Sequence, residues 1–463
     1  MFAVSARHLQ GTARALGTLK IIGGAPVPIP HTVVAPGAAD APMLKVSPTH
    51  RETDPPLTNP TPTPQTTPSK MGRRKLAVFW VILFVLLATL FEVSANIGLR
   101  ILRGYDGEHL YQYVYDPYKN ILPTPNFVDT RGVRHNSVGF RRSSEVAVEK
   151  PDSTYRIFLM GASTAYGLGS LWTHIQPEYE LLDDSETIDA YLEALLNDSL
   201  PGHVEVINAA ITSTWTHHHL IYLNQTILGY DPDMVLFLDG FNDFFRVERN
   251  HDQFATYAYG QPVRVIMGEP TMYSLIYQNA WWLFRKSAAA HVTSRGLQTV
   301  YQAVRPVRIQ GPMDVDAVMD GFTRSFPATA LKMHQRSGLI LRTEGVHAVF
   351  MLQPLLILER NRPGMTPIER DLFNFNVASY RPDWEEFMHR AVAFVREKEQ
   401  AMADSVGATF LDVSQPFNGV QDQVYTDYAH LTPLGNRLLA ERIAATILGT
   451  IRADLQSRTA SGR

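Results

Sequence analysis

The sequence predicts an α/β fold: a doubly wound, five-stranded parallel sheet with helices on both faces, preceded by a single transmembrane helix. Three observations predict it. Short apolar runs recur along the C-terminal part of the chain, helical patterns separate them, and a long apolar stretch with a basic flank precedes them. Near-continuous apolar runs are typical of parallel strands covered on both faces. Regular alternation of such strands with helices produces a doubly wound sheet.

The N-terminal segment 1–70 is predicted to be a disordered extension rich in proline and threonine. From Pro26 to Lys70 the composition is dominated by proline, threonine and alanine, and such a segment cannot bury enough apolar surface to offset the entropy of ordering. The first 39 residues contain no acid but include basic side chains, a pattern found in organelle transit peptides. The alternative, which we favour, is a non-functional extension upstream of a start at Met71.

Residues 72–102 are predicted to form a transmembrane anchor or signal-anchor. The basic run 73–75 precedes a 16-residue apolar stretch, Leu76–Phe91, which approaches the ~20 residues of a bilayer span. The positive flank places the N-terminal side in the cytoplasm and the body of the protein outside it. The small residues at 93–95 are compatible with signal-peptide cleavage. Because apolar residues continue over 97–102, we expect an uncleaved anchor.

The region 105–150 is interpreted as a connection, and 151–455 as the main domain. Its predicted strands, which suit a flavodoxin-like sheet, are Arg156–Met160, Val204–Asn208, Met234–Asp239, Val346–Leu352 and Thr409–Val413. Its predicted helices are Thr187–Asn197, Thr216–Leu228, Trp384–Val406 and a last one from about Leu434. The stretch 246–335 lacks this alternation and is predicted to be an insertion, with Trp281 and Trp282 in a helical piece.

Composition excludes several classes of protein. The formal net charge is -3 and the pI about 6.6, which argues against nucleic acid as the main partner, since phosphate binding needs a basic excess. The chain contains no cysteine. Disulfides, a thiolate nucleophile, cysteine-ligated zinc and iron–sulfur clusters are therefore excluded.

Chemically useful residues follow the predicted strands, where open α/β sheets bind their ligands. The first strand runs into Gly161-Ala162-Ser163-Thr164, a tight turn that would expose a nucleophilic serine. The second strand ends in Asn208-Ala209-Ala210, where a backbone N–H could point the same way. The third strand is followed by Gly240-Phe241-Asn242-Asp243. The asparagine amide suits an oxyanion hole, although a polar turn is an alternative interpretation. Asp243 is expected to anchor this turn.

The motif Asp427-Tyr428-Ala429-His430 lies just before the last predicted helix, for which Thr432 and Pro433 supply the N-cap and first turn. A spacing of three residues lets the carboxylate of Asp427 reach one imidazole nitrogen while the other faces a serine. By itself the motif is also compatible with a surface loop. The run 217–219 contains three histidines, but adjacent residues on a helix cannot all face one metal ion. We interpret it as a polar helix start near the site.

Taken in order, these blocks resemble the SGNH (GDSL-like) hydrolase superfamily, in its membrane-anchored bacterial type. The match runs from about Asn136 to Ile447, and the lead-in Asn-Ser-Val-Gly-Phe-Arg at 136–141 is part of it. The resemblance implies a nucleophile, a general base that becomes the acid, and an orienting carboxylate: Ser163, His430 and Asp427. It also implies an oxyanion hole of the Asn242 amide and the backbone N–H groups of Ser163 and Ala210. Ala162 and Ala210 depart from the family pattern, which has aspartate and glycine there.

The resemblance implies an extracytoplasmic serine esterase that hydrolyses O-acetyl or other short acyl esters with no metal or organic cofactor. The expected substrates are acylated carbohydrates or lipid esters, and the N-terminal helix would hold the protein in the membrane. An O-acyltransferase acting on envelope polysaccharide would use the same residues. A non-catalytic binding or assembly protein that retains the fold is a further alternative, which the departures at Ala162 and Ala210 leave open.

Overall fold

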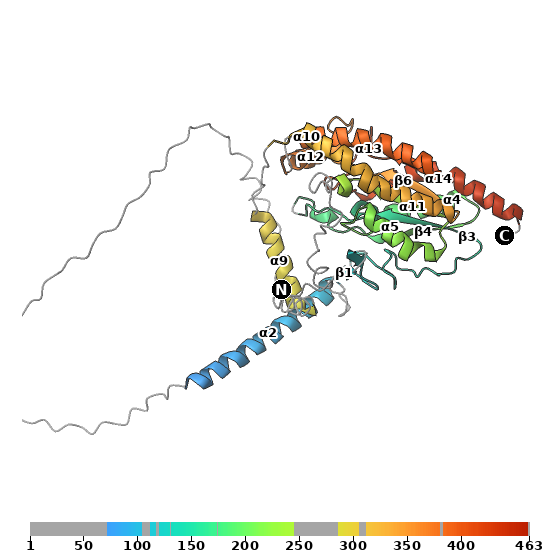
Figure 1. The fold of residues 1–463 in the computed structure, drawn as a ribbon. Helices are drawn as coiled ribbons and strands as arrows, with labels where there is room; N and C mark the ends of the chain where they lie inside the picture. The colour runs from blue at the N-terminus through green and yellow to red at the C-terminus, as the bar shows by residue number, and fades with distance from the viewer. Residues whose placement is uncertain are drawn as a thin grey trace, which may run out of the picture. The chain divides into compact units, whose positions relative to one another are not determined.

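The structure is a computed structural model, drawn in Figure 1. It describes residues 72–103, 112–116, 120–129, 131–173, 175–244, 286–304, 312–379 and 383–461. Contacts divide the chain into Met1–Lys70 and Met71–Arg463. The segment 1–70 and the pair Trp281 and Trp282 lie outside the described residues, so the interpretations made of them remain predictions.

The predicted five-stranded parallel sheet is confirmed. It consists of β3 (Thr154–Gly161), β4 (His203–Asn208), β5 (Met234–Asp239), β6 (His347–Leu352) and β7 (Thr409–Asp412). All neighbouring pairs are parallel, in the spatial order β4-β3-β5-β6-β7. The order reverses between β3 and β5, and ligands of doubly wound sheets bind beyond the carboxyl ends of the strands at such a switch point. The segments that follow β3 and β5 are those predicted to carry Ser163 and Asn242.

Helices cover both faces of the sheet (Figure 1). On one face, Tyr155, Ile157 and Leu159 of β3 share a core with α4 (Ile188–Ser199) and α14 (Pro433–Ser461). Phe158 and Met160 of β3 belong to a second core on the opposite face, with α5 (Thr216–Gln225) and α11 (Lys332–Thr343). Because both faces are buried, the strands have no polar side, which explains their near-continuous apolar sequence.

The ends of the predicted helices follow local signals. The helix α13 spans Trp384–Val406, as predicted, and stops at Gly407, whose positive φ of 72° suits a glycine C-cap. The helix α14 begins at Pro433, and the Thr432 hydroxyl accepts the Gly435 N–H at 3.2 Å as an N-cap. The predicted helix from Thr216 is interrupted at Thr226, where α5 gives way to a 3₁₀ turn, Ile227–Tyr230.

Several further elements complete the described chain. The connecting region holds an antiparallel hairpin of β1 (Tyr113–Asp116) and β2 (Asn120–Pro123). The stretch predicted as an insertion includes α9 (Ala288–Val304), α10 (Val315–Phe326) and a π-helix (Pro327–Leu331) that continues into α11. The remaining elements are α3 (Ser163–Tyr166), α12 (Pro367–Ser379) and short 3₁₀ turns at Pro177–Tyr179, Asp184–Glu186 and Leu356–Leu358.

The apolar N-terminal stretch forms one continuous helix, α2 (Arg73–Arg103). Its most apolar 18-residue window has a mean hydropathy of 2.6 and is unburied, and among the described residues α2 is the one helix long and apolar enough to cross a membrane. The carboxylate of Glu92 accepts the N–H groups of Ala288 at 2.6 Å and Ala289 at 3.1 Å, at the start of α9. Ala95 belongs to the same small cluster. Of the segment considered for signal-peptide cleavage, Ala95 is therefore buried in a helix–helix contact, whereas Val93 and Ser94 are exposed.

Candidate active site

Ser163 lies at the first position of α3, directly beyond β3. The turn depends on Gly161, which has a φ of 152° and whose added Cβ would lie 2.5 Å from the carbonyl oxygen of Leu238. No larger residue fits there, so glycine brings the chain tightly from strand to helix. Ser163 is half-buried, whereas the residues around it in α3 are buried. This turn therefore presents the hydroxyl at the carboxyl edge of the sheet.

His430 and Asp427 meet Ser163 in a linear arrangement. The distance from His430 Nε2 to Ser163 Oγ is 2.8 Å, and Asp427 Oδ2 lies 2.7 Å from His430 Nδ1. The two residues are fully buried. One imidazole nitrogen thus faces a hydroxyl and the other a carboxylate, which is the geometry of a Ser–His–Asp triad.

Asp427 is held by more than the histidine. Its Oδ1 accepts the N–H groups of Ala429 and His430, both at 3.0 Å, and its Oδ2 accepts the N–H of Leu171 at 2.8 Å. Burial by itself would raise the pKa of Asp427, but His430 and these N–H donors together hold the pKa below its ordinary value. The side chain is therefore a carboxylate at neutral pH and accepts a hydrogen bond from His430 Nδ1–H.

Asn242 follows β5 and is half-buried. Its Nδ2 donates to the carbonyl oxygen of Thr214 at 2.7 Å, which fixes the amide and leaves its second N–H for another acceptor. The N–H of Ala210 donates to Asn208 Oδ1 at 3.2 Å, so an oxyanion would have to share or displace that bond. Among the described non-glycine residues, positive φ occurs at Asn126, Ser213 and Asp231, so Ala210 carries no left-handed strain.

The departure at Ala162 leaves the backbone donor of the next residue in place. Ala162 precedes α3 without a side-chain cap. The first N–H groups of a helix have no intrahelical acceptor. The N–H of Ser163 is therefore suited to accept the role that the resemblance assigns to it in an oxyanion hole.

Two supporting residues were not identified from the sequence. Gln353, buried directly after β6, donates to Thr164 Oγ1 at 3.1 Å and accepts the Phe241 N–H at 3.4 Å. It therefore links the serine turn to the asparagine turn. Its position beyond a buried strand is the same signal that pointed to Ser163 and Asn242. Arg141, buried in the lead-in block, donates to the carbonyl oxygens of Tyr166 and Gly167 at 2.7 and 2.8 Å and so supports the end of α3.

The other sequence candidates lie behind the site. Asp243 is buried and accepts the Thr216 hydroxyl at 2.9 Å, and burial raises its pKa to about 7. His219, from the run 217–219, contacts Asp239 at the end of β5. Within the described residues, no group of three or more histidines and carboxylates has the arrangement of a metal site.

Aromatic rings lie next to the histidine. The Tyr428 ring is 5.8 Å from the His430 ring, between centroids, and 4.6 Å from Phe241. Trp172 lies 5.7 Å from Tyr428 and 4.8 Å from Phe375 in an edge-to-face contact. Of the four rings, Trp172, Phe375 and Tyr428 are half-buried, so they offer apolar surface beside the triad.

The fold and this site define a doubly wound α/β protein with a Ser–His–Asp arrangement at its switch point. No protein-family model matches the chain, and no curated protein matches it. Solved structures to which the chain is similar include a variant of Axe2, an acetyl xylan esterase from Geobacillus stearothermophilus, which is 13% identical with a TM-score of 0.33 over 64% of this chain and 97% of that chain. A GDSL-like lipase from Bacteroides thetaiotaomicron VPI-5482 is 11% identical, with a TM-score of 0.31 over 65% and 89%.

A further structure, TesA, is 15% identical, with a TM-score of 0.32 over 63% of this chain and 97% of that chain.

Proposed function

We propose that this protein is a serine esterase in which Ser163, His430 and Asp427 form the catalytic triad. The observation that carries the proposal is the pair of contacts at His430: 2.8 Å from Nε2 to the serine hydroxyl and 2.7 Å from Nδ1 to the buried carboxylate. These distances let the imidazole take a proton from the hydroxyl while the carboxylate stabilises the resulting imidazolium.

The proposed hydrolysis proceeds in two steps, acylation of Ser163 and then deacylation by water. Ser163 Oγ attacks the ester carbonyl carbon and its proton passes to His430 Nε2. The oxyanion accepts hydrogen bonds from the Asn242 amide and from the N–H groups of Ser163 and Ala210. Collapse breaks the ester bond, and Nε2 returns the proton to the departing alcohol. Water then attacks the acyl group on Ser163 in the same way and releases the acid.

The substrates that fit this proposal are short acyl esters of carbohydrates or lipids. The half-buried ring of Tyr428 next to His430, and that of Trp172 against Tyr428, provide apolar faces for the part of the substrate that carries the ester. No metal or organic cofactor enters these steps, because the serine, histidine and hydrogen-bond donors supply the nucleophile, the base and the oxyanion stabilisation.

The proposal is tested by treating the full chain, purified in detergent, with a fluorophosphonate probe and locating the adduct by mass spectrometry. We expect one adduct, on Ser163, because the probe reacts with serines that a neighbouring base activates. Heat-unfolded protein is the control and should remain unlabelled. A folded protein without an adduct, or with the adduct on another serine, would contradict the triad and favour a binding protein.

We also propose that α2 is an uncleaved membrane anchor and that the catalytic domain is extracytoplasmic. The support is the apolar length of α2, the basic run 73–75 before it and the contact of Glu92 and Ala95 with the start of α9. Protease added outside intact cells or spheroplasts should digest the domain after 103. Digestion only after the cells are lysed would reverse the assigned orientation.

A further inference from the structure

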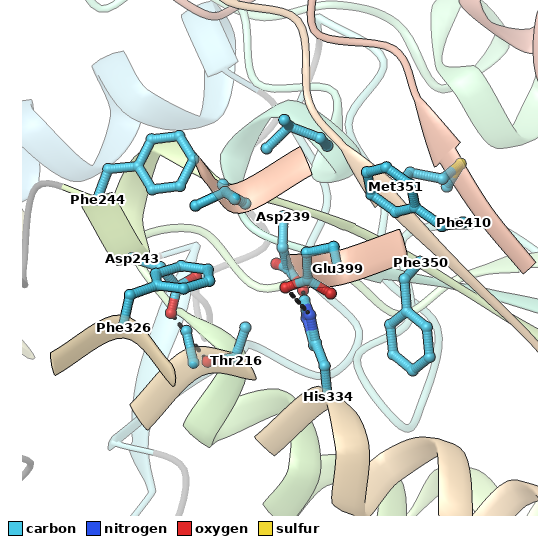
Figure 2. Close-up of a pocket in the computed structure, with 14 residues that line it drawn as sticks. Thr216, Asp239, Asp243, Phe244, Phe326, His334, Phe350, Met351, Glu399 and Phe410 are labelled. Carbon is cyan, nitrogen blue, oxygen red and sulfur yellow. Dashed lines mark hydrogen bonds and ion pairs between the residues drawn. The ribbon is translucent and has the colours of Figure 1, made fainter. Parts of the chain in front are cut away.

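A chain of buried polar side chains runs behind Asn242. Figure 2 shows its inner end, where His334 of α11 lies between Asp239 and Glu399. His334 Nε2 is 3.1 Å from Asp239 Oδ2, and its Nδ1 is 2.9 Å from Glu399 Oε1. Because both ring nitrogens face carboxylates, both must donate, and the ring is an imidazolium.

The electrostatics of this cluster agree with the geometry. Burial would lower the pKa of His334, but Glu399 and Asp239 outweigh it and raise the pKa to about 10. Asp239 is buried as well, yet His219 and His334 hold its pKa below the ordinary value. A buried charge pair of this kind is costly to break from one side, since the remaining partner is left without compensation.

The chain continues from Asp239 to the site. His219 Nδ1 lies 3.1 Å from Asp239, and its Nε2 lies 2.9 Å from the hydroxyl of Thr214. That hydroxyl also donates to the carbonyl oxygen of Ile211 at 2.5 Å. The carbonyl oxygen of Thr214 itself accepts the Asn242 amide at 2.7 Å. His334, Asp239, His219 and Thr214 are called the buried chain below.

We propose that His334 is a positioning residue for the oxyanion hole. It acts through the buried chain, which fixes the carbonyl of Thr214 and so aims the second N–H of Asn242 at the ester oxygen. The inference rests on the proposed esterase function. It explains why β5 ends in a charged, buried aspartate three residues before Asn242, where an apolar residue would satisfy the core.

The physical reason is that oxyanion stabilisation depends on preorganised donors. A donor that must be reoriented during the reaction loses much of its value. Misplacement of a reacting group by about 1 Å costs on the order of 100-fold in rate. Loss of the His334 charge would free Asp239 and His219 to rearrange, and the Thr214 segment with them. The cost should appear in kcat, since the amide contributes mainly in the transition state.

The test is a double-mutant cycle with His334→Gln and Asn242→Ala, measured as kcat and KM on a short acyl ester. Asn242→Ala should lower kcat about 10²–10³-fold. His334→Gln alone should lower kcat about 10–100-fold with KM nearly unchanged. In the Asn242→Ala background, His334→Gln should lower kcat less than about twofold, because residues that act through one another are non-additive.

Leu341→Ala, a buried apolar change on the same helix, is the matched control for lost stability. It should lower the melting temperature and leave kcat within about twofold. If His334→Gln fails to fold, Thr214→Val removes the hydroxyl, with its contacts to His219 and to the carbonyl oxygen of Ile211, and should give the same non-additive loss with Asn242→Ala.

Additive losses, or a fall in melting temperature without a fall in kcat, would overturn the positioning role. An inactive wild type would instead contradict the esterase function, and the positioning role with it. The fluorophosphonate experiment separates these outcomes, since the wild type must be labelled for the first to be meaningful.

Discussion

Replacing Ser163 with alanine is expected to reduce ester turnover by about 10⁶-fold, to the level that binding and the oxyanion hole alone sustain. Among the described residues, the Ser163 hydroxyl is the one hydrogen-bond partner of His430 Nε2, at 2.8 Å. Its removal leaves the base without a nucleophile to activate. The fold should be unaffected, because Ser163 is half-buried and alanine is compatible with the first position of the four-residue helix α3. Steady-state hydrolysis and a thermal melt measure the two quantities.

Ser153→Ala is the matched control, since this exposed serine precedes β3 at the opposite edge of the sheet. It should retain full turnover. If Ser163→Ala kept more than about a hundredth of the wild-type rate, a second nucleophile or a water-based mechanism would have to replace the covalent one.

Replacing Asp427 with asparagine is expected to lower kcat about 10⁴-fold while the protein remains folded. The carboxylate accepts from His430 Nδ1 at 2.7 Å and from three backbone N–H groups. An asparagine can keep some of these bonds with its carbonyl oxygen, but its amide group donates. It would favour the tautomer of His430 with a bare Nδ1 and a protonated Nε2, which cannot take the serine proton. The asparagine NH₂ group would also face the Leu171 N–H, and two donors facing each other form no hydrogen bond.

Measurement of kcat, together with fluorophosphonate labelling rate, tests this prediction, and both should fall together. Asp422→Asn serves as control, because Asp422 is exposed in the same loop. A labelling rate that stays at the wild-type level would mean that His430 is oriented by backbone contacts alone. In that case Asp427 would be a structural cap of its own loop.

Local patterns predicted most of the fold. The five strands were found from apolar runs, and α13 from its period and the glycine at 407, because burial on both faces and helix capping leave signals within a few residues. The candidate site could also be predicted, since functional side chains of open α/β sheets lie beyond the carboxyl ends of the strands. Ser163, Asn242 and the motif from Asp427 to His430 were all named from their places relative to strands and to the last helix.

The sequence alone therefore determined the fold class, the order of the blocks and the residues of the candidate triad. Only the tertiary structure decided which residues hold these groups in position. His334 contacts Asp239 and Glu399, Gln353 donates to Thr164, and Glu92 accepts from the start of α9. These partners are 65 to 196 residues apart in the sequence. Pairings at that range depend on how layers pack, and packing leaves no period in the chain. The bond between the Ala210 N–H and Asn208 is local, but it too was decided only by the structure, because spacing gives proximity and not the direction of a backbone donor.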